Sequence, residues 1–144
     1  MENIRILIVE DAAPMRSFIK ASIKASFPGQ VEIEEAGSGE AAMKQLEVKP
    51  CDIVLCDWNL PGIKGTELLV WMKGQEKLKG IPFMMLTAHN EKDVVTGAIN
   101  MGASDFLMKP ITAEALSKRL MAAIRTVLDM RKNEAGKDDS AGGG

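Results

Sequence analysis

Apolar positions along the chain alternate between short continuous runs and longer stretches with helical spacing. The continuous runs end on polar or charged residues, which is typical of strands buried on both faces of a parallel sheet. The run Ile53-Val54-Leu55-Cys56, for example, stops abruptly at Asp57. We expect strands at residues 4–9, 31–35, 53–57, 82–86 and 105–108.

The stretches between these runs have the spacing of amphipathic helices. After Pro14, apolar residues recur at Met15, Phe18, Ile19 and Ile23, so that one side of a helix would be apolar. Four further helices are expected: one capped by Ser38, one over residues 66–73, one capped by Asn90 and ended by Gly102, and one from Thr112 to about residue 132.

Strict alternation of five strands with five helices predicts an α/β fold, a doubly wound five-stranded parallel sheet covered on both faces. Residues 1–132 would form this domain. The remaining segment, "NEAGKDDSAGGG", has almost nothing apolar to bury. We therefore expect residues 133–144 to be a disordered tail or a linker remnant.

The composition narrows the classes of protein that fit. Of 144 residues, 46% are hydrophobic and 26% charged, as in globular domains. The net charge of −2 argues against direct nucleic acid binding or a general attraction to membranes. No apolar run has the length of a membrane span and the polar start does not resemble a secretory signal, so a cytoplasmic location is expected. Cys51 and Cys56 lack a metal-ligand spacing and are expected to be reduced structural thiols.

Charged and polar side chains stand where four of the expected strands end. Glu10 and Asp11 follow the first strand, Asp57 ends the third, Thr87 follows the fourth and Lys109 follows the fifth. The carboxyl ends of parallel strands lie along one edge of the sheet, where ligands bind. We expect these five side chains to meet there.

This set of side chains suits phosphoryl chemistry with a metal ion. Three crowded carboxylates repel one another and need a cation, and their oxygens suit Mg²⁺. With Mg²⁺ and Lys109 the formal charges cancel, which would favour a phosphoryl group that Thr87 could also contact. Asp57 is the candidate nucleophile, because a carboxylate can form an aspartyl phosphate.

Four motifs together resemble a response-regulator receiver domain of the single-domain chemotaxis type. They are the acidic pair at residues 10–11, "CDWNLPG" at 56–62, "LTA" at 86–88 and "DFLMKP" at 105–110. The resemblance extends from about Ile4 to Leu128. It implies a flavodoxin-like fold with strand order 2-1-3-4-5.

The resemblance also implies a role for each acidic residue. Asp57 would accept a phosphoryl group from a phosphohistidine on a sensor histidine kinase or a histidine phosphotransfer protein. Mg²⁺ would be bound by Glu10, Asp11, Asp57 and the backbone carbonyl of Asn59, whose side chain would modulate the chemistry. The domain would catalyse its own phosphorylation and dephosphorylation and would not be an enzyme acting on other substrates.

Further residues match the family's phosphoryl-binding and switch positions. Thr87 and Lys109 would contact phosphoryl oxygens, and Pro110 matches a proline that follows a cis peptide bond. Phe106 stands at the switch aromatic, without the hydroxyl of a tyrosine, and His89 would modulate the reaction from the pocket mouth. The fourth helix, fifth strand and last helix would form the surface that binds a downstream output protein or domain.

Three other functions are compatible with parts of this pattern. A phosphatase of the haloacid-dehalogenase type needs a second carboxylic acid two residues after the nucleophile, where this chain has Asn59. A flavodoxin-like cofactor carrier needs a phosphate loop after the first strand, where Glu10 and Asp11 would repel phosphate. An inactive receiver would serve only as an interaction module, yet every chemical position is filled here.

Overall fold

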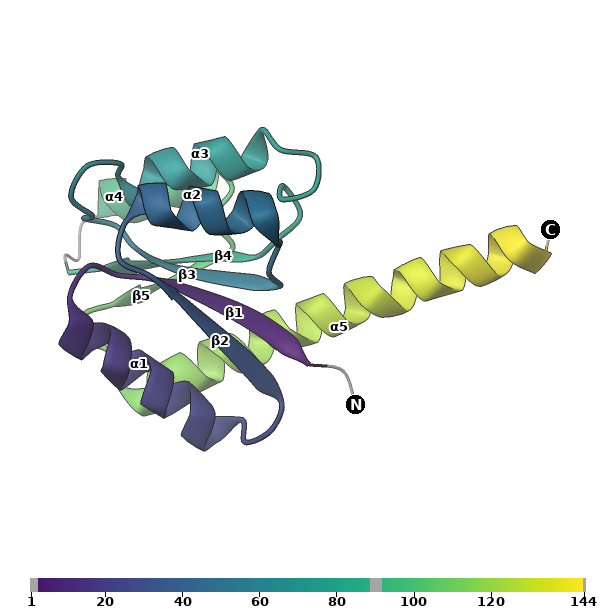
Figure 1. Ribbon diagram of the computed structural model, residues 1–144, viewed down its shortest axis with the longest axis horizontal. Helices are drawn as coiled ribbons and strands as arrows, with labels where there is room; N and C mark the ends of the chain where they lie inside the picture. Colours follow the sequence, from purple (N-terminus) through teal and green to yellow (C-terminus); the bar gives the residue numbers. More distant parts are fainter. Residues whose placement is uncertain (1–2, 89–91, 144) are drawn as a thin grey trace.

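The computed structural model describes residues 3–88 and 92–143 and shows a parallel sheet between two layers of helices (Figure 1). The strand order is β2-β1-β3-β4-β5. The strands are β1 Ile4–Val9, β2 Val31–Ala36, β3 Ile53–Asp57, β4 Phe83–Thr87 and β5 Asp105–Met108. The helices are α1 Ala13–Ser26, α2 Gly39–Val48, α3 Gly65–Lys73, α4 Lys92–Asn100 and α5 Ala113–Gly143.

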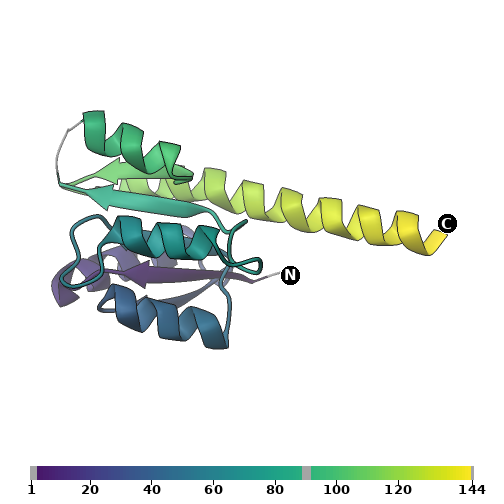
Figure 2. The same cartoon turned by 90° about the horizontal axis from the view of Figure 1, so that it is seen from above.

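The helices cover both faces of the sheet. Figures 1 and 2 show α2, α3 and α4 on one face and α1 and α5 on the other. The expected doubly wound, flavodoxin-like α/β fold is therefore confirmed, including the strand order. Within the described residues, no helix has both the length and the apolar character needed to cross a bilayer.

Each inner strand contributes to two separate cores. In β1, Leu7 and Val9 face the layer of α2, α3 and α4, while Ile6 and Ile8 face α1 and α5. None of these four side chains is more than 1% exposed. Burial on both faces explains why the strand sequence is a continuous apolar run instead of an alternating one.

The two cysteines are free and buried, as expected for reduced structural thiols. Burial raises the pKa of Cys51 to about 12 and raises that of Cys56 still further. Both side chains therefore stay as neutral, unreactive thiols at neutral pH.

Most of the expected helix ends are observed. Ser38 Oγ accepts a hydrogen bond from the Ala41 amide at 3.1 Å, which confirms the predicted N-cap of α2. Gly102 follows α4 with a φ of +109°, and its amide donates to the Ile99 carbonyl at 3.0 Å. The expected cap Asn90 lies outside the described residues.

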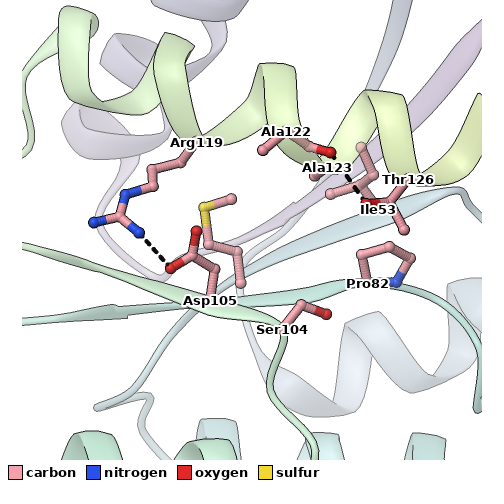
Figure 3. Close-up of a pocket in the computed structure, with 9 residues that line it drawn as sticks. Ile53, Pro82, Ser104, Asp105, Arg119, Ala122, Ala123 and Thr126 are labelled. Carbon is pink, nitrogen blue, oxygen red and sulfur yellow. Dashed lines mark hydrogen bonds and ion pairs between the residues drawn. The ribbon is translucent and has the colours of Figure 1, made fainter.

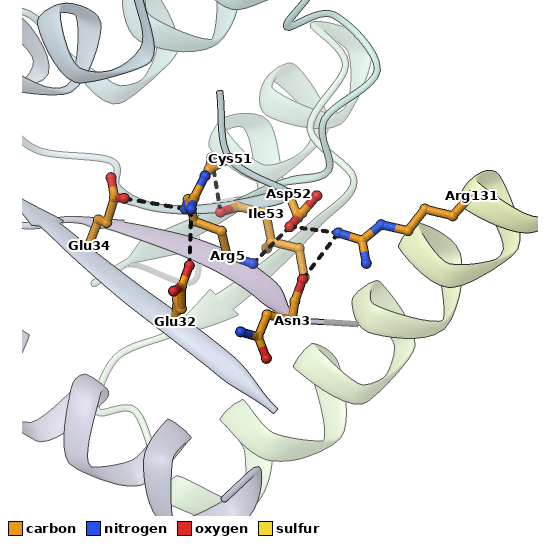
Figure 4. Close-up of polar contacts among 8 residues, drawn as sticks. All are labelled: Asn3, Arg5, Glu32, Glu34, Cys51, Asp52, Ile53 and Arg131. Carbon is orange, nitrogen blue, oxygen red and sulfur yellow. Dashed lines mark hydrogen bonds and ion pairs between the residues drawn. The ribbon is translucent and has the colours of Figure 1, made fainter. Parts of the chain in front are cut away.

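An arginine near the middle of α5 joins this helix to the amino-terminal edge of the sheet (Figure 4). Arg131 Nη2 lies 3.0 Å from Asp52 Oδ2 and donates to the Asn3 carbonyl at 3.2 Å. The same Asp52 oxygen accepts from the Arg5 amide at 2.8 Å. These contacts connect α5 to the starts of β1 and β3.

Beyond residue 132, where the sequence predicts the end of the last helix, α5 continues to Gly143. The expectation that residues 133–144 are a disordered tail or a linker remnant stays a prediction. This segment contains no proline, so the helical hydrogen bonds can continue through it. Figures 1 and 2 show it projecting away from the sheet and from the other helices.

Gly65 allows the first turn of α3 to approach the end of β3 closely. A Cβ atom at this position would lie 2.6 Å from the Asp57 carbonyl oxygen and 3.2 Å from Met85 Sδ. The Gly65 amide also donates to the Trp58 carbonyl at 3.2 Å. A glycine is therefore required for α3 to pack behind Asp57.

We predict that Gly65→Ala lowers the free energy of unfolding by about 1–3 kcal/mol, because the backbone of β3 or α3 must move to admit the methyl group. Urea denaturation measures this change. Gly80→Ala is the matched control, since a Cβ atom there meets nothing within 4 Å. Equal stability of the two variants would contradict the close approach.

We predict that amides of residues 133–143 exchange with solvent within seconds, while those of residues 116–131 are protected. A helical segment that projects away from the sheet and the other helices is marginally stable in water, and this one is rich in Gly, Asp and Ser. Hydrogen exchange followed by mass spectrometry or NMR measures the difference. Uniform protection along α5 would show that the extension is a stable part of the domain.

Candidate functional site

The five side chains expected at the carboxyl edge of the sheet stand at the ends of β1, β3, β4 and β5. Glu10 and Asp11 follow β1, Asp57 and Thr87 end β3 and β4, and Lys109 follows β5. Glu10, Asp57 and Thr87 are buried, with exposed fractions of 2%, 5% and 1%, whereas Asp11 is exposed. Burial of these polar groups outside the apolar cores makes the edge a candidate functional site.

The three carboxylates form a compact cluster. One oxygen each from Glu10, Asp11 and Asp57 lie within 4.8 Å of one another. Lys109 Nζ lies 3.2 Å from Asp57 Oδ1 and 3.5 Å from Glu10 Oε1. With three negative charges and one positive charge, the cluster retains a net negative charge that a divalent cation would offset.

Glu10 shows the cost of burying a carboxylate within this cluster. Burial raises its pKa from 4.5 to about 7, and a hydrogen bond and charge repulsion from Asp57 act in the same direction, while Lys109 opposes them. Glu10 Oε2 is buried without a hydrogen-bond partner among the described residues. A buried carboxylate oxygen with no donor is suited to bind a metal ion, so the residues fit Mg²⁺.

The loop after β3 places Asn59 beside the central carboxylate. The Asn59 amide donates to Asp57 Oδ1 at 3.4 Å. Lys64 Nζ donates to Asn59 Oδ1 at 3.2 Å and to the Leu60 carbonyl at 3.1 Å, which holds the loop closed. Binding of a metal ion by the Asn59 carbonyl stays a prediction.

Arg16 holds the acidic loop after β1. Its Nη1 donates to the carbonyl oxygens of Glu10 and Asp11 at 2.7 and 3.3 Å, so the guanidinium fixes the backbone that carries both acids. Neither Arg16 nor Lys64 was identified from the sequence. The available signal was a cation in the helical turn after an acidic pair and another in the loop after Asn59.

The structure gives the positions of the other expected residues, except His89. Thr87 is buried, and its carbonyl accepts from the Lys109 amide at 2.7 Å, which joins the ends of β4 and β5. Phe106 is half-buried against the core beneath α2, α3 and α4. The Lys109–Pro110 peptide bond is cis. His89 lies outside the described residues.

Comparison of the sequence with known proteins gives a consistent family. A model of the response regulator receiver domain matches residues 6–121. Chemotaxis protein CheY-3 of Vibrio cholerae is 34% identical over 119 residues, which are 83% of this chain and 90% of CheY-3. Chemotaxis protein CheY of Pseudomonas aeruginosa is 34% identical over 116 residues, covering 81% of this chain and 92% of CheY. Phosphate regulon transcriptional regulatory protein PhoB of Escherichia coli is 33% identical over 130 residues, but these are only 56% of PhoB.

Solved structures agree with this assignment. The signal receiver domain of a LuxO repressor protein from Vibrio parahaemolyticus has a TM-score of 0.83 at 26% identity, over 92% of this chain and 98% of that domain. The chemotaxis response regulator CheY4 of Vibrio cholerae has a TM-score of 0.78 at 25% identity, over 84% of this chain and 98% of CheY4. The chain therefore belongs to the response regulator receiver domain family, the phosphoacceptor signalling domains of two-component systems.

Proposed function

We propose that Asp57 accepts a phosphoryl group from a phosphohistidine of a histidine kinase or histidine phosphotransfer protein. The observation that carries this proposal is the position of Asp57, which is buried at the end of a central strand with Lys109 Nζ 3.2 Å away. A carboxylate oxygen would form a bond to phosphorus while the phosphorus–nitrogen bond to the imidazole breaks and the imidazole leaves. A cytoplasmic location stays a prediction.

Receiver domains bind Mg²⁺ at an acidic pocket, and we assign that role here to Glu10, Asp11, Asp57 and the Asn59 carbonyl. When bound, Mg²⁺ supplies charge neutralisation for the transferred group. The ammonium of Lys109 would neutralise a second phosphoryl oxygen. Phosphoryl transfer depends mainly on positioning and on charge stabilisation, which is what these groups can supply.

The proposal extends to a conformational switch. The Thr87 hydroxyl would donate to a phosphoryl oxygen and draw the end of β4 toward Asp57. Phe106 pairs with Met85 of β4, two residues before Thr87, and would follow this movement. The exposed surface of α4, β5 and α5 would then change its affinity for a downstream output protein or domain.

The alternative functions have less support. A phosphatase of the haloacid-dehalogenase type lacks its general acid, because Asn59 carries an amide that cannot protonate a leaving group. A flavodoxin-like cofactor carrier is disfavoured by the buried carboxylate of Glu10, which would repel a cofactor phosphate. An inactive receiver is disfavoured because Lys109 contacts both Glu10 and Asp57.

We predict that acetyl phosphate with Mg²⁺ gives a phosphoryl adduct that hydroxylamine removes. Asp57→Asn should abolish the adduct, and Lys109→Gln should slow its formation on the order of 10²-fold, because the second cation is lost. Intact-protein mass spectrometry measures both. Lys44→Gln, at an exposed position on α2, is the matched control and should react like the wild type. A hydroxylamine-stable adduct on a serine or threonine would overturn the proposal.

We predict that the metal-free protein loses stability as the pH rises from about 5 to 7. The pKa of Glu10 is raised to about 7 in the folded state, so below that pH the folded state binds more protons than the unfolded state. The loss of unfolding free energy over this pH range should be on the order of 1–3 kcal/mol, and Glu10→Gln should remove it.

The same raised pKa makes Mg²⁺ compete with a proton at Glu10. Calorimetry should therefore show the affinity of the wild type for Mg²⁺ rising as the pH increases through 7, and Glu10→Gln should bind more weakly with a flatter profile. Glu47→Gln, exposed on α2, is the control. An unchanged profile in Glu10→Gln would remove Glu10 from the metal site.

A further inference from the structure

Asp105, Phe106 and Arg119 all contact one another at the edge strand β5. Asp105 Oδ1 accepts from Arg119 Nη1 at 2.7 Å and from the Phe106 amide at 2.8 Å. The Arg119 guanidinium carbon lies 5.9 Å from the centre of the Phe106 ring, within the range of a cation–π contact. Figure 3 shows Arg119 reaching from α5 to Asp105.

Arg119 comes from a helix on one face of the sheet and contacts a side chain on the other face, around the edge of β5. Phe106 packs against the core beneath α2, α3 and α4, whereas α5 covers the opposite face. A side chain from α5 can approach the Phe106 ring only around an edge strand, and β5 is the last strand of the sheet. Asp105, bonded to both partners, holds the guanidinium at that edge.

The contact is strong enough to bias a movement and weak enough to be broken. The side chains of Arg119 and Asp105 are 48% and 25% exposed, so solvent screens their attraction. A cation–π contact at such a site changes an equilibrium about two- to fivefold. Small residues, Ala122 and Ala123, line the pocket beside this pair in Figure 3, which leaves the Arg119 side chain room to move.

We propose that Arg119 is a positioning residue that holds the Phe106 ring in its half-buried position, through Asp105, and so opposes the switch. This inference rests on the proposed function. A phenylalanine has no hydroxyl that could hydrogen-bond at the surface and keep the ring half-buried. The guanidinium of Arg119 over the ring provides the stabilising contact instead. If Phe106 moves toward Thr87, the ring leaves Arg119 and the contact that stabilises the resting arrangement is lost.

The first test needs no phosphorylation. In aromatic NMR spectra of the Mg²⁺-loaded protein, Arg119→Gln should shift the ring signals of Phe106, which Phe106→Leu identifies by their disappearance. Arg125→Gln removes an exposed guanidinium from the same helix and should leave those signals unchanged. Unshifted Phe106 signals in Arg119→Gln would overturn the proposal.

The second test measures the bias on the switch. Arg119→Gln should speed phosphoryl uptake from acetyl phosphate about two- to fivefold, because the resting arrangement loses a contact that the switched one lacks. Arg119→Lys, which keeps the charge but offers a weaker ring contact, should lie between this variant and the wild type. A pure charge effect has the opposite sign, since removing a cation would slow uptake of an anionic donor.

A double-mutant cycle distinguishes action through the ring from action by charge. In the Phe106→Leu background, Arg119→Gln should no longer change the rate of uptake. The same change in both backgrounds, or slower uptake in Arg119→Gln, would overturn the proposal. If the wild type takes up no phosphoryl group, the proposed function fails, while the NMR comparison still tests the contact between Arg119 and Phe106.

Discussion

The repulsion between Glu10 and Asp57, two carboxylates buried at the same end of the sheet, is the constraint on which the rest of the site depends. Neither acid can leave, because each directly follows or ends a strand that is buried on both faces. The apolar packing of β1 and β3 thus holds together charges that would separate in water. Burial is the main cause of the raised pKa of Glu10, and Asp57 adds to it, while the Lys109 ammonium offsets part of the effect.

Backbone atoms fix the geometry around these charges. Arg16 binds the carbonyls behind Glu10 and Asp11, and Lys64 closes the loop that carries Asn59. Gly65 lets α3 approach the Asp57 carbonyl. Three different residues therefore restrain the main chain on either side of the acidic cluster, so that the positions of the carboxylates are set before any ligand binds.

Much of this arrangement could be predicted from sequence, for identifiable reasons. Continuous apolar runs specify parallel strands, and their shared edge brings Asp57 and Lys109 together from distant parts of the chain. Arg16 and Lys64 were missed because their targets are mostly backbone carbonyls, which every residue has. Arg119 was missed because its contact with Phe106 passes around a strand edge. The helical conformation of residues 133–143 could not be predicted in the same way, because composition shows that a segment has few apolar side chains to bury and does not show its local backbone conformation.

If α5 tilts about the Arg131 contact, the helix acts as a lever with that contact as its pivot. At about 1.5 Å per residue, Arg119 and Gly143 each lie about 18 Å from Arg131, on opposite sides of it. If α5 is stiff, a sideways displacement of the helix at Arg119, near β5, would move Gly143 by a similar distance in the opposite direction. The stiffness of residues 133–143 then decides whether the displacement reaches the end of α5. A partner that orders these residues would transmit it, and a partner that unfolds their helix would not.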